Sequence, residues 1–203
     1  MIQWVYEATK EVFSSVAVAT EDESIKTCVE SFGGQVVMTR DSHTNGTSRV
    51  AEAVEILNWD HDYVINVQGD EPMISKDCLL DLARSLEDGQ ADVGTLMSKV
   101  HDGKELFGES EVFVFSRSII PFFHRIPQDQ WLEHGEFYKH VGLYAYKPSL
   151  LKTLVNLPES FLEKAESLEQ NRWLEHGFKI KLGETDEISY PVDTPDDVEF
   201  VRE

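Results

Sequence analysis

Cysteine is scarce in this chain, with only two among 203 residues. Cys28 and Cys78 each fall in a segment with helical apolar spacing, and their separation matches no known metal-ligand spacing. We therefore expect two small, buried thiols rather than a disulfide or a zinc site. A protein of this kind suits a reducing compartment, so a cytoplasmic location is predicted.

Positive charge is also scarce, with 18 Lys and Arg against 38 Asp and Glu and a formal net charge of −20. The overall field of such a chain repels nucleic acid and anionic membrane surfaces, which disfavours a nucleic-acid-binding function. An anionic ligand would need a few local bases or a divalent cation to offset its charge.

Long hydrophobic runs are missing as well. No apolar stretch approaches the roughly 20 residues that span a bilayer, and no basic start followed by an apolar stretch marks a secretory signal. With 41% hydrophobic residues the composition is that of an ordinary globular protein. We expect one soluble domain over residues 1–203, without a membrane partner.

Several well-known catalytic motifs are absent. The sequence contains no G-x-x-x-x-G-K-[ST] or G-x-G-x-x-G phosphate loop, no H-E-x-x-H and no G-x-S-x-G. His134 and His176 each stand in Glu-His-Gly, where histidine and glycine favour the end of a helix. Zinc hydrolase and serine esterase functions are therefore not supported.

What the first half does contain is a regular alternation of helices and strands. The apolar run Val64 to Val67 is typical of a strand that is buried on both faces. Helices are predicted over residues 1–13, 21–33, 47–57 and 76–86, and strands over 15–20, 35–38, 64–67 and 92–97. Thr47 is expected to cap the third helix. Four such alternations predict an α/β fold with a mostly parallel, open sheet flanked by helices.

The second half changes character. Glu111 to Phe115 and Val141 to Tyr146 resemble strands, and the segment between them is rich in loops. We expect a smaller antiparallel insertion or lobe within about residues 105–150. Further on, helices are predicted over 148–155 and 160–176, a strand over 179–182, and a last helix capped by Thr194.

Two acidic residues follow predicted strands directly. Asp70 ends the Val64 to Val67 strand, and Asp193 precedes the last helix. Open α/β sheets bind ligands at the carboxyl ends of their strands, and two carboxylates plus substrate oxygens suit Mg²⁺. The alternative is ordinary turn and capping chemistry, and these residues alone do not exclude it.

Five other polar residues could contribute to a site, and each also has a plain structural interpretation. Arg117 could bind a carboxylate in bidentate fashion but could equally be a surface arginine. A lone histidine such as His140, four residues before Tyr144, is more often structural than catalytic. Glu169 and Gln170 fall in the middle of a predicted helix, where polar residues usually face solvent.

Several short sequence motifs, taken in their order along the chain, closely resemble those of one family, the 3-deoxy-manno-octulosonate (Kdo) cytidylyltransferases, also called CMP-Kdo synthetases. The resemblance covers nearly the whole chain. The motifs that match are residues 18–22, 38–40, 45–49, 66–72, 115–117, 140–146, 168–170 and 192–196.

The resemblance implies a nucleotidyltransferase-type α/β fold, usually dimeric, acting in lipopolysaccharide assembly. In that family the anomeric hydroxyl of Kdo attacks the α-phosphorus of CTP and pyrophosphate leaves. By the family pattern Asp70 and Asp193 would hold Mg²⁺. The residues expected around the sugar are Gln68, Arg117, His140, Tyr144, Glu169 and Gln170. Those expected to face the nucleotide are Asn45, Gly46, Thr47 and Arg49.

Two departures from the family pattern carry expectations of their own. A first strand and a basic, glycine-containing loop should precede Met1, and about ten more residues should stand between Phe107 and Val112. We expect such segments to be mobile and left out of the sequence. A chain that truly began at Met1 is expected to show no turnover.

Two other functions stay open at the level of sequence. The first is a cytidylyltransferase for another acidic sugar, such as amino-Kdo or a sialic acid, because one hydroxyl-to-amine difference lies beyond sequence reading. The second is a non-catalytic sugar or nucleotide binder that kept the sheet but lost the phosphate loop.

Overall fold

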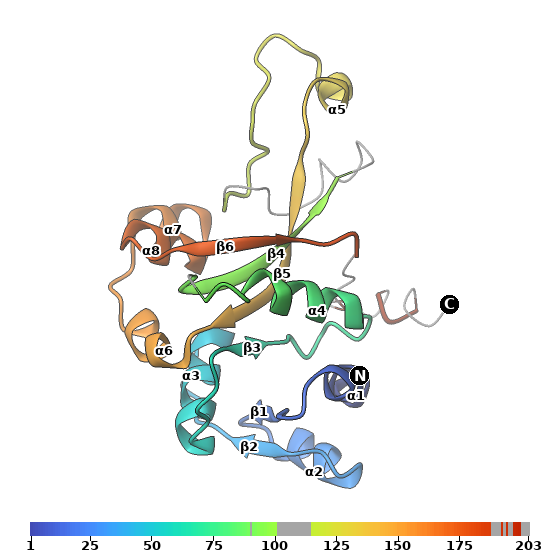
Figure 1. The fold of residues 1–203 in the computed structure, drawn as a ribbon, viewed down its shortest axis with the longest axis vertical. Coiled ribbons are helices and arrows are strands. Elements are labelled where there is room, and N and C mark those ends of the chain that lie inside the picture. Colours follow the sequence, from blue (N-terminus) through green and yellow to red (C-terminus); the bar gives the residue numbers. More distant parts are fainter. Residues whose placement is uncertain (90, 101–114, 188–191, 193, 195–196, 200–203) are drawn as a thin grey trace.

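The computed structural model describes residues 1–89, 91–100, 115–187, 192, 194 and 197–199. Its first half alternates helices and strands as predicted from the apolar spacing (Figure 1). The elements are α1 (Ile2–Val12), β1 (Val18–Thr20), α2 (Glu23–Ser31), β2 (Val36–Met38), α3 (Gly46–Leu57), β3 (Val64–Asn66), α4 (Lys76–Ser85) and β4 (Val93–Lys99). The Asp22 and Ser75 side chains cap α2 and α4 by accepting backbone N–H bonds, as expected for these residue types.

The second half combines one long strand with short helices. Its elements are η2 (Gln128–Gln130), α5 (Trp131–His134), β5 (Tyr138–Tyr146), α6 (Pro148–Val155), α7 (Phe161–Glu166), α8 (Glu169–Glu175) and β6 (Ile180–Glu184). The strand expected at Glu111 to Phe115 lies largely outside the described residues, as does the Phe107 to Val112 interval. At the end of the chain the Thr194 hydroxyl accepts from Asp197 N (3.4 Å), which fits the predicted cap.

Most strands run parallel, as expected, and β5 is the exception. β1 pairs with β2 in parallel, and the second sheet has the order β3-β5-β4-β6. In that sheet β4 and β6 are parallel, whereas β5 is antiparallel to both β3 and β4. The α/β class is confirmed, with β5 inserted between two strands that share one direction.

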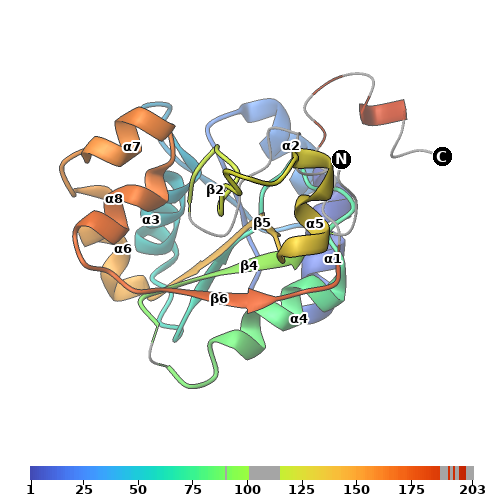
Figure 2. The same cartoon turned by 90° about the horizontal axis from the view of Figure 1, so that it is seen from above.

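Helices cover both faces of the four-stranded sheet (Figure 2). On one face Leu79 and Leu82 of α4 pack with Leu96 and Leu143 of the sheet, and α1 lies beside them. On the other face α3, α6 and α8 surround a cluster that includes Tyr144, Tyr146 and Trp173. Tyr144, one of the predicted site residues, belongs to this second cluster.

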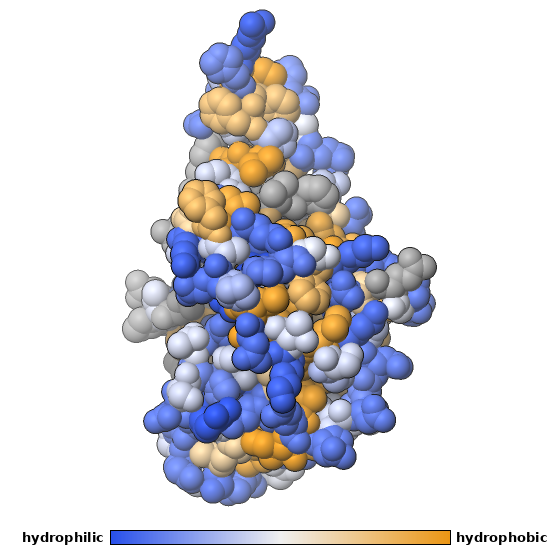
Figure 3. All heavy atoms as spheres, turned by 90° about the vertical axis from the view of Figure 1, so that its left-hand side faces the viewer, coloured by the Kyte–Doolittle hydropathy of each residue, from blue (hydrophilic) through white to orange (hydrophobic). Residues whose placement is uncertain are grey.

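The segment from Phe115 to Phe137 projects from the body together with the outer ends of β4 and β5 (Figure 1). Trp131 and Phe137 are buried in a small cluster of its own, with Phe123 packed against them. Phe122, by contrast, is 67% exposed. Figure 3 shows apolar atoms gathered on this projecting arm, above a body whose surface is mostly hydrophilic. Among the described residues, no helix is both long and apolar enough to cross a bilayer.

Three local predictions are wrong for identifiable reasons. Asn45, not Thr47, caps α3, because its side chain accepts from Ser48 N while the Thr47 hydroxyl bonds elsewhere. The helix expected over 160–176 is broken, since Ser167 has a left-handed backbone (φ 53°) that divides α7 from α8. Cys28 is exposed on α2, whereas Cys78 is buried as expected.

Candidate active site

The turn after β3 contains the first predicted metal ligand. β3 ends at Asn66, and Asp70 follows in a turn where its residue is half-buried. The Val192 N–H donates to the Asp70 carbonyl oxygen (2.8 Å), so a segment 122 positions further along the chain meets this turn. Asp193, the second predicted ligand, lies outside the described residues. Within the described part of the chain, no three His, Cys, Asp or Glu side chains gather in a metal-binding group.

The loop predicted to face a nucleotide forms the start of α3. Asn45 Oδ1 accepts from Ser48 N (2.9 Å), which fixes the first turn of the helix. Gly46 follows in close approach to β3, since a Cβ there would lie 3.0 Å from Asn66 Nδ2 and 3.4 Å from Gln68 Nε2. A side chain at position 46 would press on the Asn66 amide, which would have to move by a few tenths of an ångström. The structure thus brings Asn45, Gly46 and Gln68 together.

Arg49 and its neighbours form a network of ion pairs and hydrogen bonds behind that loop. Arg49 Nη1 donates to Thr39 Oγ1 (2.8 Å), and its guanidinium pairs with Glu21. Glu52 on α3 accepts from Arg40 N (2.9 Å) and Arg40 Nε (2.7 Å) and also pairs with His43. These bonds hold residues 39–43 against α3, although the sequence analysis did not single out Glu52.

Replacement of Glu52 by glutamine tests how much this network contributes to stability, through the dependence of Tm on pH. The hydrogen bond from His43, followed by the bond from Arg40 N, lowers the pKa of Glu52 from 4.5 to about 2. A carboxyl with a depressed folded-state pKa stabilises the fold above its ordinary pKa, and that contribution is lost as the pH falls through the folded value. Glu52→Gln is therefore expected to lower Tm at pH 6, with a difference from wild type that shrinks between pH 4.5 and 2.

Thermal unfolding followed by circular dichroism across this pH range provides the measurement. Glu55→Gln on the same helix is the matched control, because Glu55 is exposed and its carboxylate lies 3.9 Å from Lys152 Nζ in a weak surface pair. A Glu52→Gln protein with the wild-type Tm at pH 6 would show that the Glu52 carboxylate adds nothing to stability.

Glu169 and Gln170 form the first turn of α8 rather than the middle of a longer helix. Glu169 Oε1 accepts from Asn45 Nδ2 (3.1 Å), and Glu169 Oε2 accepts from Thr47 Oγ1 (2.8 Å). Burial raises the pKa of Glu169, and these two bonds partly oppose that shift. Gln170 Nε2 donates to the Tyr144 hydroxyl. Residues far apart in sequence therefore meet in one hydrogen-bonded group.

The inner half of β5 provides an aromatic and imidazole surface. The His140 and Tyr144 rings lie 5.2 Å apart between centroids, and Phe115 contacts His140 at 5.3 Å. His140 is part of β5 itself, not a residue that precedes it as the sequence analysis assumed. Thr95 Oγ1 lies 2.9 Å from His140 Nε2, so β4 orients the imidazole.

Two members of this group were missed from sequence. Tyr146 is buried, and its hydroxyl lies 3.2 Å from Thr47 Oγ1. Burial raises the pKa of Tyr146, so it stays protonated and acts through its hydroxyl. The Tyr-Ala-Tyr spacing could have revealed it. Residues two apart on a strand share one face, so Tyr146 lies on the same face as Tyr144. Thr95 has no comparable signal, since only the pairing of β4 with β5 brings it to His140.

Arg117 is held at the carboxyl end of α7. Its Nε donates to the Glu166 carbonyl oxygen (2.7 Å), and its backbone N–H donates to Glu166 Oε2 (2.9 Å). Two residues earlier in the chain, Phe115 contacts His140. Arg117 is exposed, and its guanidinium bonds to the backbone of residues 166 and 167, just before the start of α8.

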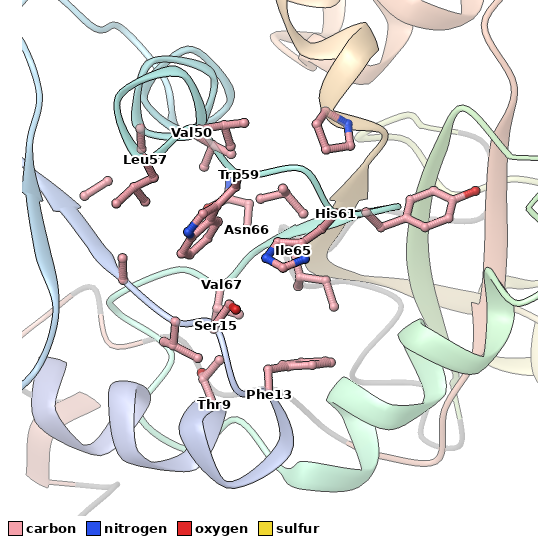
Figure 4. Close-up of a pocket in the computed structure, with 18 of the residues that line it drawn as sticks. Thr9, Phe13, Ser15, Val50, Leu57, Trp59, His61, Ile65, Asn66 and Val67 are labelled. Carbon is pink, nitrogen blue, oxygen red and sulfur yellow. The ribbon is translucent and has the colours of Figure 1, made fainter.

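A cavity of about 1240 Å³ adjoins this group, lined by β1, β3 and the facing sides of α1 and α3. Figure 4 shows Phe13 and Thr9 on one side and Val50 and Leu57 on the other, with Ile65 and Asn66 of β3 and the following Val67 beside them. Four of the predicted site residues are among those that line it, namely Asn45, Gly46, Arg49 and Gln68.

Taken together, the group offers hydrogen-bonding amides, hydroxyls, one imidazole and an arginine, without an activated serine or cysteine nucleophile. Burial raises the pKa of the Cys78 thiol to about 12, so it is inert. Such an arrangement can position two polar ligands and neutralise charge between them. It suits transfer chemistry in which the substrate itself supplies the nucleophile.

Comparison with known proteins agrees with this geometry. The sequence profile of the cytidylyltransferases matches residues 1–180. The chain is 43% identical to the 3-deoxy-manno-octulosonate cytidylyltransferase of Parabacteroides distasonis, over 98% of this chain and 85% of that protein. It is 41% identical to the protein of the same name in Bacteroides thetaiotaomicron, over 100% of this chain and 86% of that one.

Solved structures show the same likeness. The structure of a CMP:2-keto-3-deoxy-manno-octonic acid synthetase complexed with CTP has a TM-score of 0.88 at 36% identity, covering 99% of this chain and 85% of that one. A 4-diphosphocytidyl-2C-methyl-D-erythritol synthase from Anaerococcus prevotii has a TM-score of 0.65 at 13% identity, covering 98% and 86%, which shows a shared fold alone.

Proposed function

The chain belongs to the family of 3-deoxy-manno-octulosonate cytidylyltransferases, and we propose that it transfers CMP from CTP to the anomeric hydroxyl of Kdo. The products are CMP-Kdo and pyrophosphate. The observation that supports this most is the likeness to a CTP-bound CMP-Kdo synthetase over 99% of the chain, at 36% identity. The polar group built from α3, β5 and α8 supplies a matching site.

On this proposal the start of α3 faces the nucleotide. Asn45, Gly46, Thr47 and Arg49 supply an amide, a close backbone approach, a hydroxyl and a guanidinium. The sugar contacts Gln68, Arg117, His140, Tyr144 and Gln170, with Arg117 the natural partner for its carboxylate. Glu169, which the resemblance also implies beside the sugar, bonds to Asn45 and Thr47 in this structure. His140, oriented by Thr95, donates or accepts a hydrogen bond without a change of backbone position.

Asp70 and Asp193 would hold Mg²⁺. The fit rests on the chemistry of the donors, since carboxylates are preferred ligands of Mg²⁺, and on the backbone bond from Val192 to Asp70, which places Val192 beside Asp70. When bound, the metal neutralises charge on the phosphate oxygens. The residues of this chain then orient the sugar hydroxyl and exclude competing water.

We also infer a homodimer in the cytoplasm. The projecting arm carries the 67% exposed Phe122, and a second copy would remove such an apolar side chain from water. The cysteine content and net charge support the compartment.

Pyrophosphate release is the test of this function. Release is expected only when CTP, Kdo and Mg²⁺ are all present, and it is measured with a coupled phosphate assay on a chain whose mass has been verified. A non-catalytic binder would instead take up sugar or nucleotide in calorimetry with no release. Release that is faster with amino-Kdo or a sialic acid than with Kdo would favour the alternative substrates.

A further inference from the structure

The first turn of α8 lies between the two halves of the site. Glu169 contacts the start of α3 through Asn45 and Thr47, on the nucleotide side. The next residue, Gln170, contacts Tyr144 on the sugar side. Two adjacent residues of one short helix therefore bond to both predicted ligand surfaces.

The bond between Glu169 and Asn45 has a fixed direction. Asn45 Oδ1 is engaged as the helix cap by Ser48 N, so the Nδ2 group is left to donate to Glu169. Thr47 adds a second donor to the other carboxylate oxygen, and Tyr146 lies behind it. A shift of the α3 start would break these contacts together, so the position of the Glu169 carboxylate depends on the position of the whole first turn.

Packing makes this turn a firm connector. Leu168, just before it, is 3% exposed, and Trp173, one turn later, is fully buried. Trp173 packs edge-on against both Tyr144 and Tyr146, at centroid distances of 6.0 and 5.7 Å. The helix is thereby anchored to β5, the strand that carries His140 and Tyr144.

We propose that Glu169 is a positioning residue that couples nucleotide binding at the α3 start to sugar binding at β5, through Gln170 and Tyr144. The inference rests on the proposed function for the identity of the two ligands. A nucleotide bound at Asn45 and Thr47 fixes the position of the Glu169 carboxylate, and the anchored helix passes that position to Gln170 and Tyr144 on the sugar side. By linkage the effect is reciprocal, and the sugar raises nucleotide affinity by the same factor.

The experiment measures a ratio of affinities. Kdo binding is followed by calorimetry with Mg²⁺, in the absence and presence of saturating α,β-methylene CTP, which cannot release pyrophosphate. In wild type the analogue is expected to tighten Kdo binding by at least about 5-fold. In Glu169→Ala this factor is expected to fall to about 1, and Glu169→Gln, which keeps an acceptor for Asn45, should retain part of it.

Glu175→Ala serves as the matched control on the same helix, because Glu175 is exposed and its carboxylate accepts from Leu162 N, away from both ligand surfaces, and it should keep the wild-type factor. A Glu169→Ala protein that keeps the full factor would overturn the coupling. So would a wild-type factor of 1 with both ligands bound. Failure of wild type to bind either ligand would instead overturn the proposed function itself.

Discussion

Asp70→Asn is expected to lower kcat for CMP transfer by about 1000-fold while leaving the fold intact. The substitution keeps the shape of the side chain but removes the charge that a divalent cation requires. Asp70 is half-buried in a turn that also bonds the backbone of Val192, so no long-range rearrangement is expected. Steady-state pyrophosphate release at saturating CTP and Kdo gives the rate.

Asp77→Asn is the control for Asp70. Asp77 is exposed in the first turn of α4, where its charge only complements the helix dipole. Its loss should leave kcat within about 2-fold and change the free energy of unfolding by at most about 1 kcal/mol. An Asp70→Asn enzyme with more than a tenth of wild-type kcat, and an unchanged dependence on Mg²⁺, would remove Asp70 from the metal site.

Trp173→Ala is expected to have the largest effect on stability, about 3–5 kcal/mol in the free energy of unfolding. Trp173 is fully buried and supports both Tyr144 and Tyr146. Truncation leaves a cavity directly behind the polar group of the site, and the loss includes both transfer free energy and packing. Urea unfolding followed by far-ultraviolet circular dichroism measures the change.

Trp173→Phe separates packing from hydrogen bonding. Trp173 Nε1 has no hydrogen-bond partner among the described residues, so the phenyl ring loses volume but also removes a buried polar atom. We expect a cost of about 1–2 kcal/mol, well below that of alanine. If alanine and phenylalanine cost the same, or if alanine costs less than about 1 kcal/mol, Trp173 does not support the site as described.

Local signals predicted the first half of the fold well. Apolar runs marked β2 and β3, and helical apolar spacing marked α2 and α4. The break between α7 and α8 escaped, because a serine with positive φ has no sequence signature comparable to glycine. The insertion of β5 between β3 and β4 depends on tertiary pairing, which periodicity does not encode.

The sequence predicted several residues of the candidate site, but not the contacts between them. Asn45, Gly46, Thr47, Tyr144, Glu169 and Gln170 were singled out by resemblance, and the structure brings them into contact. The resemblance did not say that Glu169 bonds to α3, or that Thr95 orients His140. Such contacts join residues 45 to 124 positions apart, and only the folded chain reveals them.

The identity of the product is the most direct test of the central claim. Mass spectrometry of the reaction that contains CTP, Kdo and Mg²⁺ is predicted to show one new species, whose mass equals CMP plus Kdo less one water, formed in equal amount to pyrophosphate. Consumption of CTP with release of pyrophosphate but without a CMP-sugar of that mass would contradict the account.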